Sequence, residues 1–242
     1  MQDRTNASAS DRAGVSRNEH TRGTVILLHG FVGLPIMSRP QARMLRRAGF
    51  ETRELGYDSW GKSLAQICDR LLPRIARIAE RSDGPVHFVG HSMGGLVIRA
   101  LLSRWRPVDL GHVVMLGTPN AGSEVADFVD SWAVLRPILG QAGPALVTRR
   151  SMTVEKLFGP IDYSLGIIAG DWNLPGTPFS RLFDGAHDGK VSVASTWLPE
   201  AADHIVLPLP HTLLLYHRDA HSAARHFLIH GRFAEDAQRD YP

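Results

Sequence analysis

Short apolar runs and amphipathic stretches alternate along the chain. Apolar runs of this length are typical of strands that are buried on both faces of a sheet. The strongest runs are residues 24–28, 85–90, 112–117 and 165–170, and the weaker ones are residues 50–55 and 205–208. Because these runs alternate with helical patterns, the sequence predicts βαβ units and an α/β fold. We expect a mostly parallel sheet of about six strands with helices on both faces.

Apolar residues at helical spacing predict the helices, which we place at residues 38–48, 64–79, 93–105 and 219–233. Ser38 and Gln41 are predicted to form a capping box at the start of the first helix, and Gly49 is predicted to stop it. Pro73 is expected to kink or divide the second helix. Cys68 lies on the apolar stripe of that helix, so we interpret it as a packing residue.

The 242 residues predict one domain at 23–242, preceded by a polar, disordered lead-in at 1–22. A single cysteine excludes an internal disulfide framework and an all-cysteine zinc site. We find no signal-peptide-like segment and no apolar stretch long enough to span a membrane. The sequence therefore predicts a cytoplasmic protein without stable membrane insertion. No cofactor or metal site is expected.

The net charge of +3 arises from 27 Lys and Arg residues against 24 Asp and Glu residues. Only three of the basic residues are lysines, at positions 62, 156 and 190. The densest basic cluster comprises Arg39, Arg43, Arg46 and Arg47. No aromatic or glycine-rich recognition element adjoins it, so we expect a solvated helix face rather than an anion site, and no nucleic-acid partner.

The segment from Gly90 to Gly95 carries the strongest chemical signal. Gly90, Ser92 and Gly94 match G-x-S-x-G directly after an apolar run and directly before a helical pattern. A strand that turns this sharply into a helix needs small residues two positions on either side of the serine. Ser92 is therefore the predicted nucleophile, at a helix N-terminus that favours a developing negative charge. The alternative interpretation is an ordinary glycine-rich turn.

A nucleophilic serine that attacks a carbonyl needs two N–H donors for the oxyanion. The residue after the nucleophile, Met93, offers one such backbone N–H. The second is expected from the loop after the first strand, where the N–H of Phe31 is the best candidate. The alternative for this loop is a plain strand-to-helix turn.

The base and the acid should follow the serine, in the order acid and then His. His211 comes after the last predicted strand and a short proline turn, so it is the predicted general base. His204 is expected before that strand, and the histidines of the terminal helix are expected on solvated or core faces. Asp188, flanked closely by glycines, is the predicted acid. Asp171, directly after the fifth strand run, is the alternative.

Together these motifs resemble the α/β-hydrolase superfamily. Within it, the chain is similar to bacterial lipase-like serine esterases that are related to the inositol deacylases of GPI anchors. The motifs that carry the resemblance are residues 28–31, 90–95, 117–123, 188–193 and 211–212. The resemblance implies the α/β-hydrolase fold and hydrolysis of carboxylic esters with Ser92, Asp188 and His211 as the triad. It does not extend to a GPI substrate.

Residues 120–164 form a connection that is long for a compact domain. Apolar residues at helical spacing, interrupted by Pro137, predict a helical lid over Ser92, and the alternative is a peripheral helix on the core. Phe31, Trp60 and Met93 are expected to add apolar wall to the substrate site. The predicted substrate is therefore a hydrophobic, uncharged ester. An acyltransferase with the same triad and a non-catalytic ligand-binding protein are the alternative functions.

Overall fold

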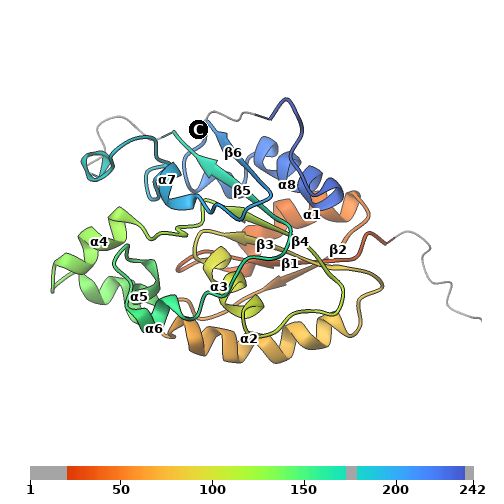
Figure 1. The fold of residues 1–242 in the computed structure, drawn as a ribbon, viewed down its shortest axis with the longest axis horizontal. Coiled ribbons are helices and arrows are strands. Elements are labelled where there is room, and N and C mark those ends of the chain that lie inside the picture. The colour runs from red at the N-terminus through yellow and green to blue at the C-terminus, as the bar shows by residue number, and fades with distance from the viewer. Residues whose placement is uncertain (1–20, 173–178, 238–242) are drawn as a thin grey trace, which may run out of the picture.

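The computed structural model describes residues 21–172 and 179–237 of the chain. Their strands form one six-stranded sheet in the order β2-β1-β3-β4-β5-β6, and every neighbouring pair is parallel. The strands are β1 (Thr24–Leu28), β2 (Glu51–Leu55), β3 (Val86–His91), β4 (Leu110–Leu116), β5 (Leu165–Gly170) and β6 (Asp203–Leu207). The predicted parallel sheet is thus confirmed (Figure 1).

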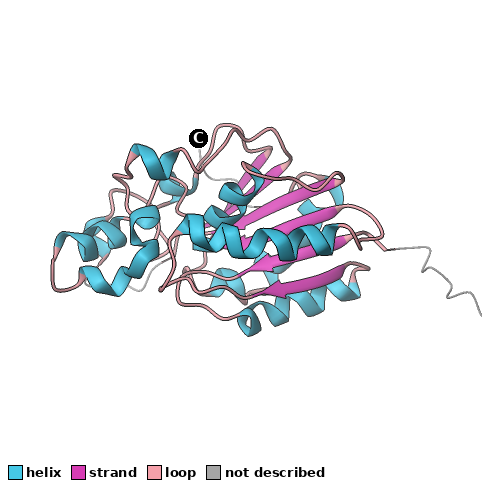
Figure 2. Cartoon of the chain, turned by 90° about the horizontal axis from the view of Figure 1, so that it is seen from below, coloured by secondary structure: helices cyan, strands magenta, loops and turns pink. Residues whose placement is uncertain are grey.

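Helices cover both faces of the sheet, as the alternating pattern predicts (Figure 2). The longer ones are α1 (Arg39–Arg47), α2 (Leu64–Ala79), α3 (Met93–Leu102), α4 (Glu124–Ser131) and α8 (Arg218–His230). The short ones are α5 (Gly143–Leu146), α6 (Met152–Glu155) and α7 (Val193–Thr196). The 3-10 helices are η1 (Pro35–Ser38), η2 (Arg136–Ala142), η3 (Ser180–Leu182) and η4 (Leu213–Leu215).

The central strands serve two separate cores because successive side chains of a strand point to opposite faces. In β1, Ile26 and Leu28 pack into the cluster with α2 and α3. Val25 and Leu27 pack into the cluster with α1 and α8. A strand that is buried on both sides needs apolar residues at every position, which explains the uninterrupted runs in the sequence.

One detail of the predicted helices is wrong. Ser38 belongs to the 3-10 turn η1 and its side chain caps nothing, whereas a capping box forms at Ser63 and Gln66 of α2. Pro73 lies within α2 without dividing it. Pro73 and Asp69, the residue whose carbonyl loses its helical donor, are both exposed, so water can satisfy that carbonyl.

Cys68 is fully buried on the core face of α2, in agreement with its interpretation as a packing residue. Burial raises the pKa of its thiol to about 12, which leaves very little of the reactive thiolate at neutral pH.

Residues 120–164 fold into α4, η2, α5 and α6, which gather at one end of the sheet (Figure 1).

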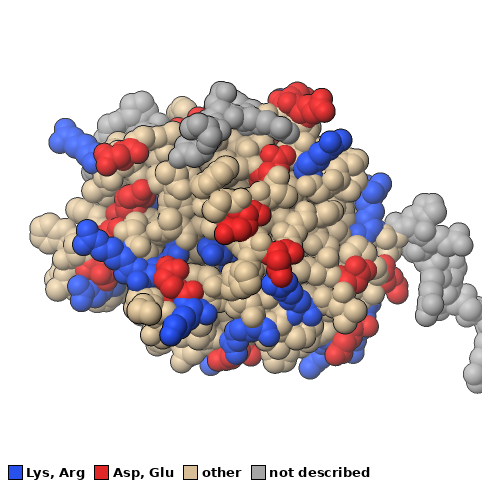
Figure 3. Space-filling view, viewed as in Figure 1, with Lys and Arg blue, Asp and Glu red and all other residues tan. Residues whose placement is uncertain are grey.

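The predicted lead-in at 1–22 lies outside the described residues except for its last two. Of the basic cluster on α1, Arg46 pairs with Glu54 on the neighbouring strand. Figure 3 shows basic and acidic side chains interspersed on the face that it draws. No helix among the described residues is long and apolar enough to cross a membrane.

Candidate active site

Ser92 occupies a sharp turn between β3 and α3. Its backbone has φ 54° and ψ −125°, a left-handed conformation that is unusual for a residue with a side chain. Two hydrogen bonds hold this turn: the Ser92 N–H donates to Leu116 O at 2.8 Å, and the Thr118 hydroxyl donates to Ser92 O at 3.1 Å. Strained backbone of this kind concentrates at functional sites.

The glycines around Ser92 fill positions where a side chain has no room. A Cβ at Gly90 would lie 2.6 Å from the backbone nitrogen of Gly95. A Cβ at Gly94 would lie 2.4 Å from the carbonyl oxygen of Leu28. Both clashes are with backbone, so neither could be relieved by a side-chain rotation. The close approach of α3 to β3 therefore depends on Gly90, and its close approach to β1 depends on Gly94.

His211 and Asp188 form a buried pair at the same edge of the sheet. The Nδ1 atom of His211 lies 2.7 Å from Oδ2 of Asp188. The other carboxylate oxygen accepts the backbone N–H groups of Lys190, at 2.9 Å, and Val191, at 2.8 Å. The backbone N–H of His211 in turn donates to the backbone carbonyl oxygen of Asp188 at 2.9 Å. These contacts fix the carboxylate and the imidazole relative to each other.

Asp171, the alternative acid, lies elsewhere. It follows β5 directly, and its backbone N–H donates to Leu207 O at 3.1 Å on the neighbouring strand. The carboxylate that lies within hydrogen-bond distance of the His211 ring is that of Asp188, and not that of Asp171. His204 lies within β6 rather than before it, so that detail of the sequence interpretation is wrong.

Two glycines at strand ends leave space for Asp188 and His211. From the sequence, Gly117 was identified only as the first residue of a motif, and Gly170 was not singled out. A Cβ at Gly117, which has φ 55°, would lie 3.1 Å from both Asp188 Oδ2 and His211 Nδ1. A Cβ at Gly170 would lie 2.9 Å from the Cβ of Asp188. Their sequence signal is a glycine directly after an apolar run, which also fits a plain strand end.

The backbone of the loop after β1 closely approaches the serine. A Cβ at Gly30 would lie 3.0 Å from the Cβ of Ser92. The next residue, Phe31, has an N–H that donates to no acceptor among the residues that the structure describes. Met93 is the first residue of α3, where an N–H has no acceptor within the helix. Both predicted oxyanion donors are therefore available for a ligand.

A second set of contacts, not foreseen from the sequence, holds this loop. The Tyr57 ring stacks on the His29 ring at 4.2 Å, and its hydroxyl donates to the His29 carbonyl. In the same loop, the Val32 N–H donates to the Ser59 hydroxyl at 2.7 Å. Tyr57 and Ser59 come from the segment after β2, and no local motif marks them.

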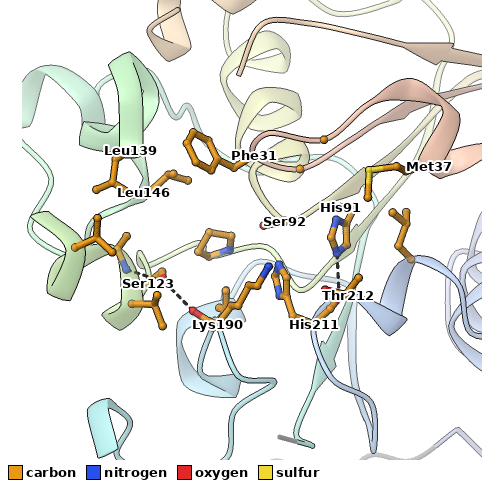
Figure 4. Close-up of a pocket in the computed structure, with 18 residues that line it drawn as sticks. Phe31, Met37, His91, Ser92, Ser123, Leu139, Leu146, Lys190, His211 and Thr212 are labelled. Carbon is orange, nitrogen blue, oxygen red and sulfur yellow. Dashed lines mark hydrogen bonds between the residues drawn. The ribbon is translucent and has the colours of Figure 1, made fainter. Parts of the chain in front are cut away.

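Ser92 and His211 line one cavity of about 210 Å³ (Figure 4). No hydrogen bond joins the serine hydroxyl to the imidazole here, and such catalytic contacts often tighten only when substrate binds. The apolar lining comes mainly from the loop after β1 and from residues 120–164. These apolar residues are Phe31, Met37, Pro119, Val125, Ala126, Val129, Leu139, Leu146, Val191 and Leu215.

Of the three residues that the sequence predicts in the apolar wall of the cavity, one lies there. Phe31 lines the cavity, but Met93 is fully buried in the core beneath the serine. Trp60 is largely exposed and does not line the cavity. Its indole N–H instead donates to the carbonyls of Pro137 and Ile138, so Trp60 holds the turn η2 from outside.

A buried guanidinium joins the two ends of the segment at residues 119–150. The side chain of Arg150 is 2% exposed. It donates to Pro119 O and Asn120 O, each at 2.6 Å, and to Ala145 O at 2.8 Å. It also stacks on Phe158. The sequence does not predict this contact, because 30 residues separate Asn120 from Arg150.

His91, next to the serine, is buried with its ring 4.9 Å from that of His211, and its Nε2 lies 3.1 Å from His211 O. Burial, and after it the neighbouring His211, lower the pKa of His91 to about 3. Burial and the nearby His112 likewise lower the pKa of His87 to about 4. Both imidazoles are therefore neutral in the folded protein at physiological pH.

These buried histidines should make the protein acid-sensitive. Below pH 6.5 the unfolded chain binds protons that the folded chain does not, so the free energy of unfolding falls as the pH falls. Between pH 7 and 5 we expect a loss of about 2 kcal/mol for each of His87 and His91. Urea unfolding of wild type and His87→Gln at both pH values measures it.

The variant His230→Gln serves as the control because His230 is exposed. The pH dependence should flatten in His87→Gln and stay as in wild type in His230→Gln. Equal slopes in all three proteins would contradict the assignment of the acid sensitivity to His87.

Among the described residues, no group of three or more His, Cys, Asp or Glu side chains is arranged to hold a metal ion. The reactive groups that the structure brings together at this site are a serine, an imidazole and a carboxylate, with two N–H groups beside them.

A family model described as "Alpha/beta hydrolase family" matches residues 25–240. A search of curated proteins finds no match. Solved structures are similar in fold. The mature lipase BlEst2 of Bacillus licheniformis has a TM-score of 0.68 at 19% identity, over 87% of this chain and 94% of that chain.

Two further structures show the same fold. A metagenomic carboxyl esterase, MGS0156, has a TM-score of 0.59 at 17% identity, over 86% of this chain and 73% of that chain. The thioesterase domain of NocB, solved as a covalent complex with a fluorophosphonate analogue of nocardicin G, has a TM-score of 0.54 at 15% identity. That match covers 86% of this chain and 93% of the NocB chain. At these identities the likeness concerns the fold.

Proposed function

Because the chain belongs to the alpha/beta hydrolase family, we propose that it is a serine hydrolase that cleaves carboxylic esters through an acyl-enzyme on Ser92. The observation that carries the proposal is the buried hydrogen bond from His211 to Asp188, because the same His211 lines one cavity with Ser92, a serine held at a strained turn. The fold of lipases and esterases supports the proposal.

In the proposed reaction, His211 takes the proton of the Ser92 hydroxyl as the oxygen attacks the ester carbonyl. The N–H groups of Phe31 and Met93 stabilise the oxyanion. His211 then protonates the leaving alcohol, and a water molecule repeats the sequence on the acyl-enzyme. Asp188 keeps the proton of the imidazole on Nδ1 and stabilises the imidazolium that forms.

The acyl chain is proposed to bind against the apolar wall. Phe31, Leu139 and Leu146 lie together on one side of Ser92 in Figure 4. Leu139 and Leu146 belong to residues 120–164, which on this proposal act as the lid over the site. A wall of this kind favours acyl chains of several carbons, because each buried methylene contributes about 0.8 kcal/mol.

A fluorophosphonate probe tests the proposal directly. We expect one equivalent to attach covalently, and peptide mapping by mass spectrometry to place it on Ser92. Rapid mixing with para-nitrophenyl hexanoate should release an initial burst of nitrophenol that matches the enzyme concentration, because the acyl-enzyme accumulates. Heat-denatured protein provides the control, since an unfolded chain has no activated serine.

Labelling at a serine other than Ser92, or neither labelling nor ester hydrolysis by the folded protein, would overturn the proposal. Prior incubation with the hexanoate ester should slow labelling, because the ester and the probe compete for one hydroxyl. Unchanged labelling would place the probe outside the substrate site.

A further inference from the structure

A single lysine lies in the wall of the Ser92 cavity. Among the described residues that line the cavity, Lys190 is the one Lys, Arg, Asp or Glu. Its side chain is exposed, and the ammonium forms no hydrogen bond or ion pair with any residue that the structure describes. A cation in the wall of the Ser92 cavity that pairs with no carboxylate among the described residues is available to an anionic ligand.

The backbone of Lys190 is anchored on both sides, so the position of the side chain is set by the fold. Its N–H donates to Asp188 Oδ1 at 2.9 Å. Its carbonyl accepts the hydroxyl of Ser123 at 2.7 Å, and the same hydroxyl caps α4. Figure 4 shows the side chain extending from this anchored backbone into the cavity, in the direction of His211.

The charge of Lys190 acts on the side of the cavity where the imidazoles lie. Lys190 and His211 both contribute to lowering the pKa of the buried His91, although burial is the largest cause. The apolar wall with Phe31 and Leu139 lies on the other side of Ser92 in Figure 4. The cavity thus has a cationic group near His211 and, apart from it, an apolar wall that includes Phe31 and Leu139.

The proposed mechanism relates these two sides to the two parts of an ester. His211 must deliver a proton to the oxygen of the leaving alcohol, so the alcohol portion lies next to His211 when the tetrahedral intermediate collapses. The acyl chain then extends toward the apolar wall. Lys190, on the His211 side, faces the alcohol portion.

We propose that the enzyme hydrolyses acyl esters whose alcohol portion carries an anionic group, a carboxylate or a phosphate, which pairs with the Lys190 ammonium. This inference rests on the proposed function. It differs from the uncharged ester that the sequence predicts, because only the fold brings Lys190 into the cavity. In the reaction the acyl–oxygen bond breaks, water supplies the hydroxyl of the released acid, and the alcohol leaves with its anionic group and a proton from His211.

An anionic alcohol would also remove an electrostatic obstacle. As His211 becomes an imidazolium, the unpaired ammonium of Lys190 opposes the new positive charge. A carboxylate or phosphate next to Lys190 neutralises the ammonium at the stage when this repulsion develops. The substrate charge therefore assists both binding and the chemical step.

The test compares two esters of the same acyl chain, para-hexanoyloxybenzoate and its neutral methyl ester, on wild type and Lys190→Met. Methionine retains much of the length of lysine without its charge. We expect kcat/KM for the carboxylate to fall about tenfold in Lys190→Met, while that for the methyl ester stays the same or rises, because the repulsion of the imidazolium is removed. Comparing the two proteins on one ester cancels the intrinsic reactivity of that ester.

Matched variants separate charge from shape. Lys190→Arg keeps a cation and should retain most of the activity on the carboxylate, and the para-phosphate analogue should behave like the carboxylate. Lys156→Met removes an exposed lysine remote from the cavity and should leave both esters unaffected. Added salt should reduce the preference of wild type and leave Lys190→Met unchanged.

Two results would overturn the inference and leave the proposed function intact. One is a labelled, active enzyme whose kcat/KM for the carboxylate is unchanged in Lys190→Met. The other is a loss of kcat/KM in Lys190→Met that appears only when the carboxylate is on the acyl portion of the ester. This is measured by comparing mono-para-nitrophenyl adipate with para-nitrophenyl hexanoate. If fluorophosphonate fails to label Ser92, the proposed function fails, and the inference falls with it.

Discussion

Ser92→Ala should lower kcat/KM for para-nitrophenyl hexanoate by about 10⁴- to 10⁶-fold, because the other hydroxyls of the cavity, Ser123 and Thr212, do not lie at the turn before α3. The fold should persist. Alanine and serine both carry a Cβ, so the left-handed backbone at position 92 is no more strained in the variant than in wild type. Steady-state kinetics measure the loss, and thermal unfolding followed by circular dichroism checks the fold.

Ser123→Ala provides the matched control, because Ser123 lines the same cavity. Its hydroxyl caps α4, so its removal should cost about 1 kcal/mol of stability. Activity on the neutral hexanoate ester should remain within about tenfold of wild type. If Ser92→Ala kept more than about one hundredth of the wild-type activity, the hydrolysis would have to proceed without an acyl-enzyme on Ser92.

Asp188→Asn should lower kcat about 10³- to 10⁴-fold with little change in structure. The amide oxygen of asparagine can still accept the N–H groups of Lys190 and Val191, as Oδ1 does now. The amide nitrogen would then face Nδ1 of His211, where an acceptor is needed. The imidazole would have to carry its proton on Nε2, and it could no longer accept the proton of Ser92.

Asp171→Asn tests the other carboxylate in the same way. Its side chain does not reach His211 in the structure, so we expect kcat to change less than about twofold. A large loss in Asp171→Asn with a small loss in Asp188→Asn would assign the role of acid to Asp171. The two variants change the formal charge equally, which leaves position as the difference between them.

The fold was predictable because burial on two faces leaves a simple trace in the sequence. Every residue of β1 is buried, so its run is apolar throughout, whereas the edge strand β2 alternates and gives a weaker pattern. Helix ends were less predictable. Ser38 and Gln41 have the right types for a capping box, but the chain turns through η1 before α1 begins. The types of these two side chains alone do not predict that a 3-10 turn precedes the helix.

The site was predictable where the chemistry is local. Ser92 and its glycines are neighbours in sequence, so their pattern could be identified without the fold. Lys190 and Tyr57 were not identified, because their roles depend on contacts with segments far away along the chain. Trp60 shows the opposite error: an aromatic residue near the site looks like cavity wall, but it faces outward and holds η2.

The contact made by Arg150 has a consequence for protein engineering. Because one guanidinium bonds to carbonyls at both ends of residues 119–150, the two points where this segment leaves and rejoins the core are held together from within. Parts of the stretch between these two points can thus be replaced. Designers could shorten, lengthen or transplant parts of residues 121–149 to reshape the apolar wall, provided that Arg150, its three carbonyl partners at Pro119, Asn120 and Ala145, and the Ser123 contact to Lys190 stay in place. New substrate ranges could then be screened without redesigning the strands that carry the reacting groups.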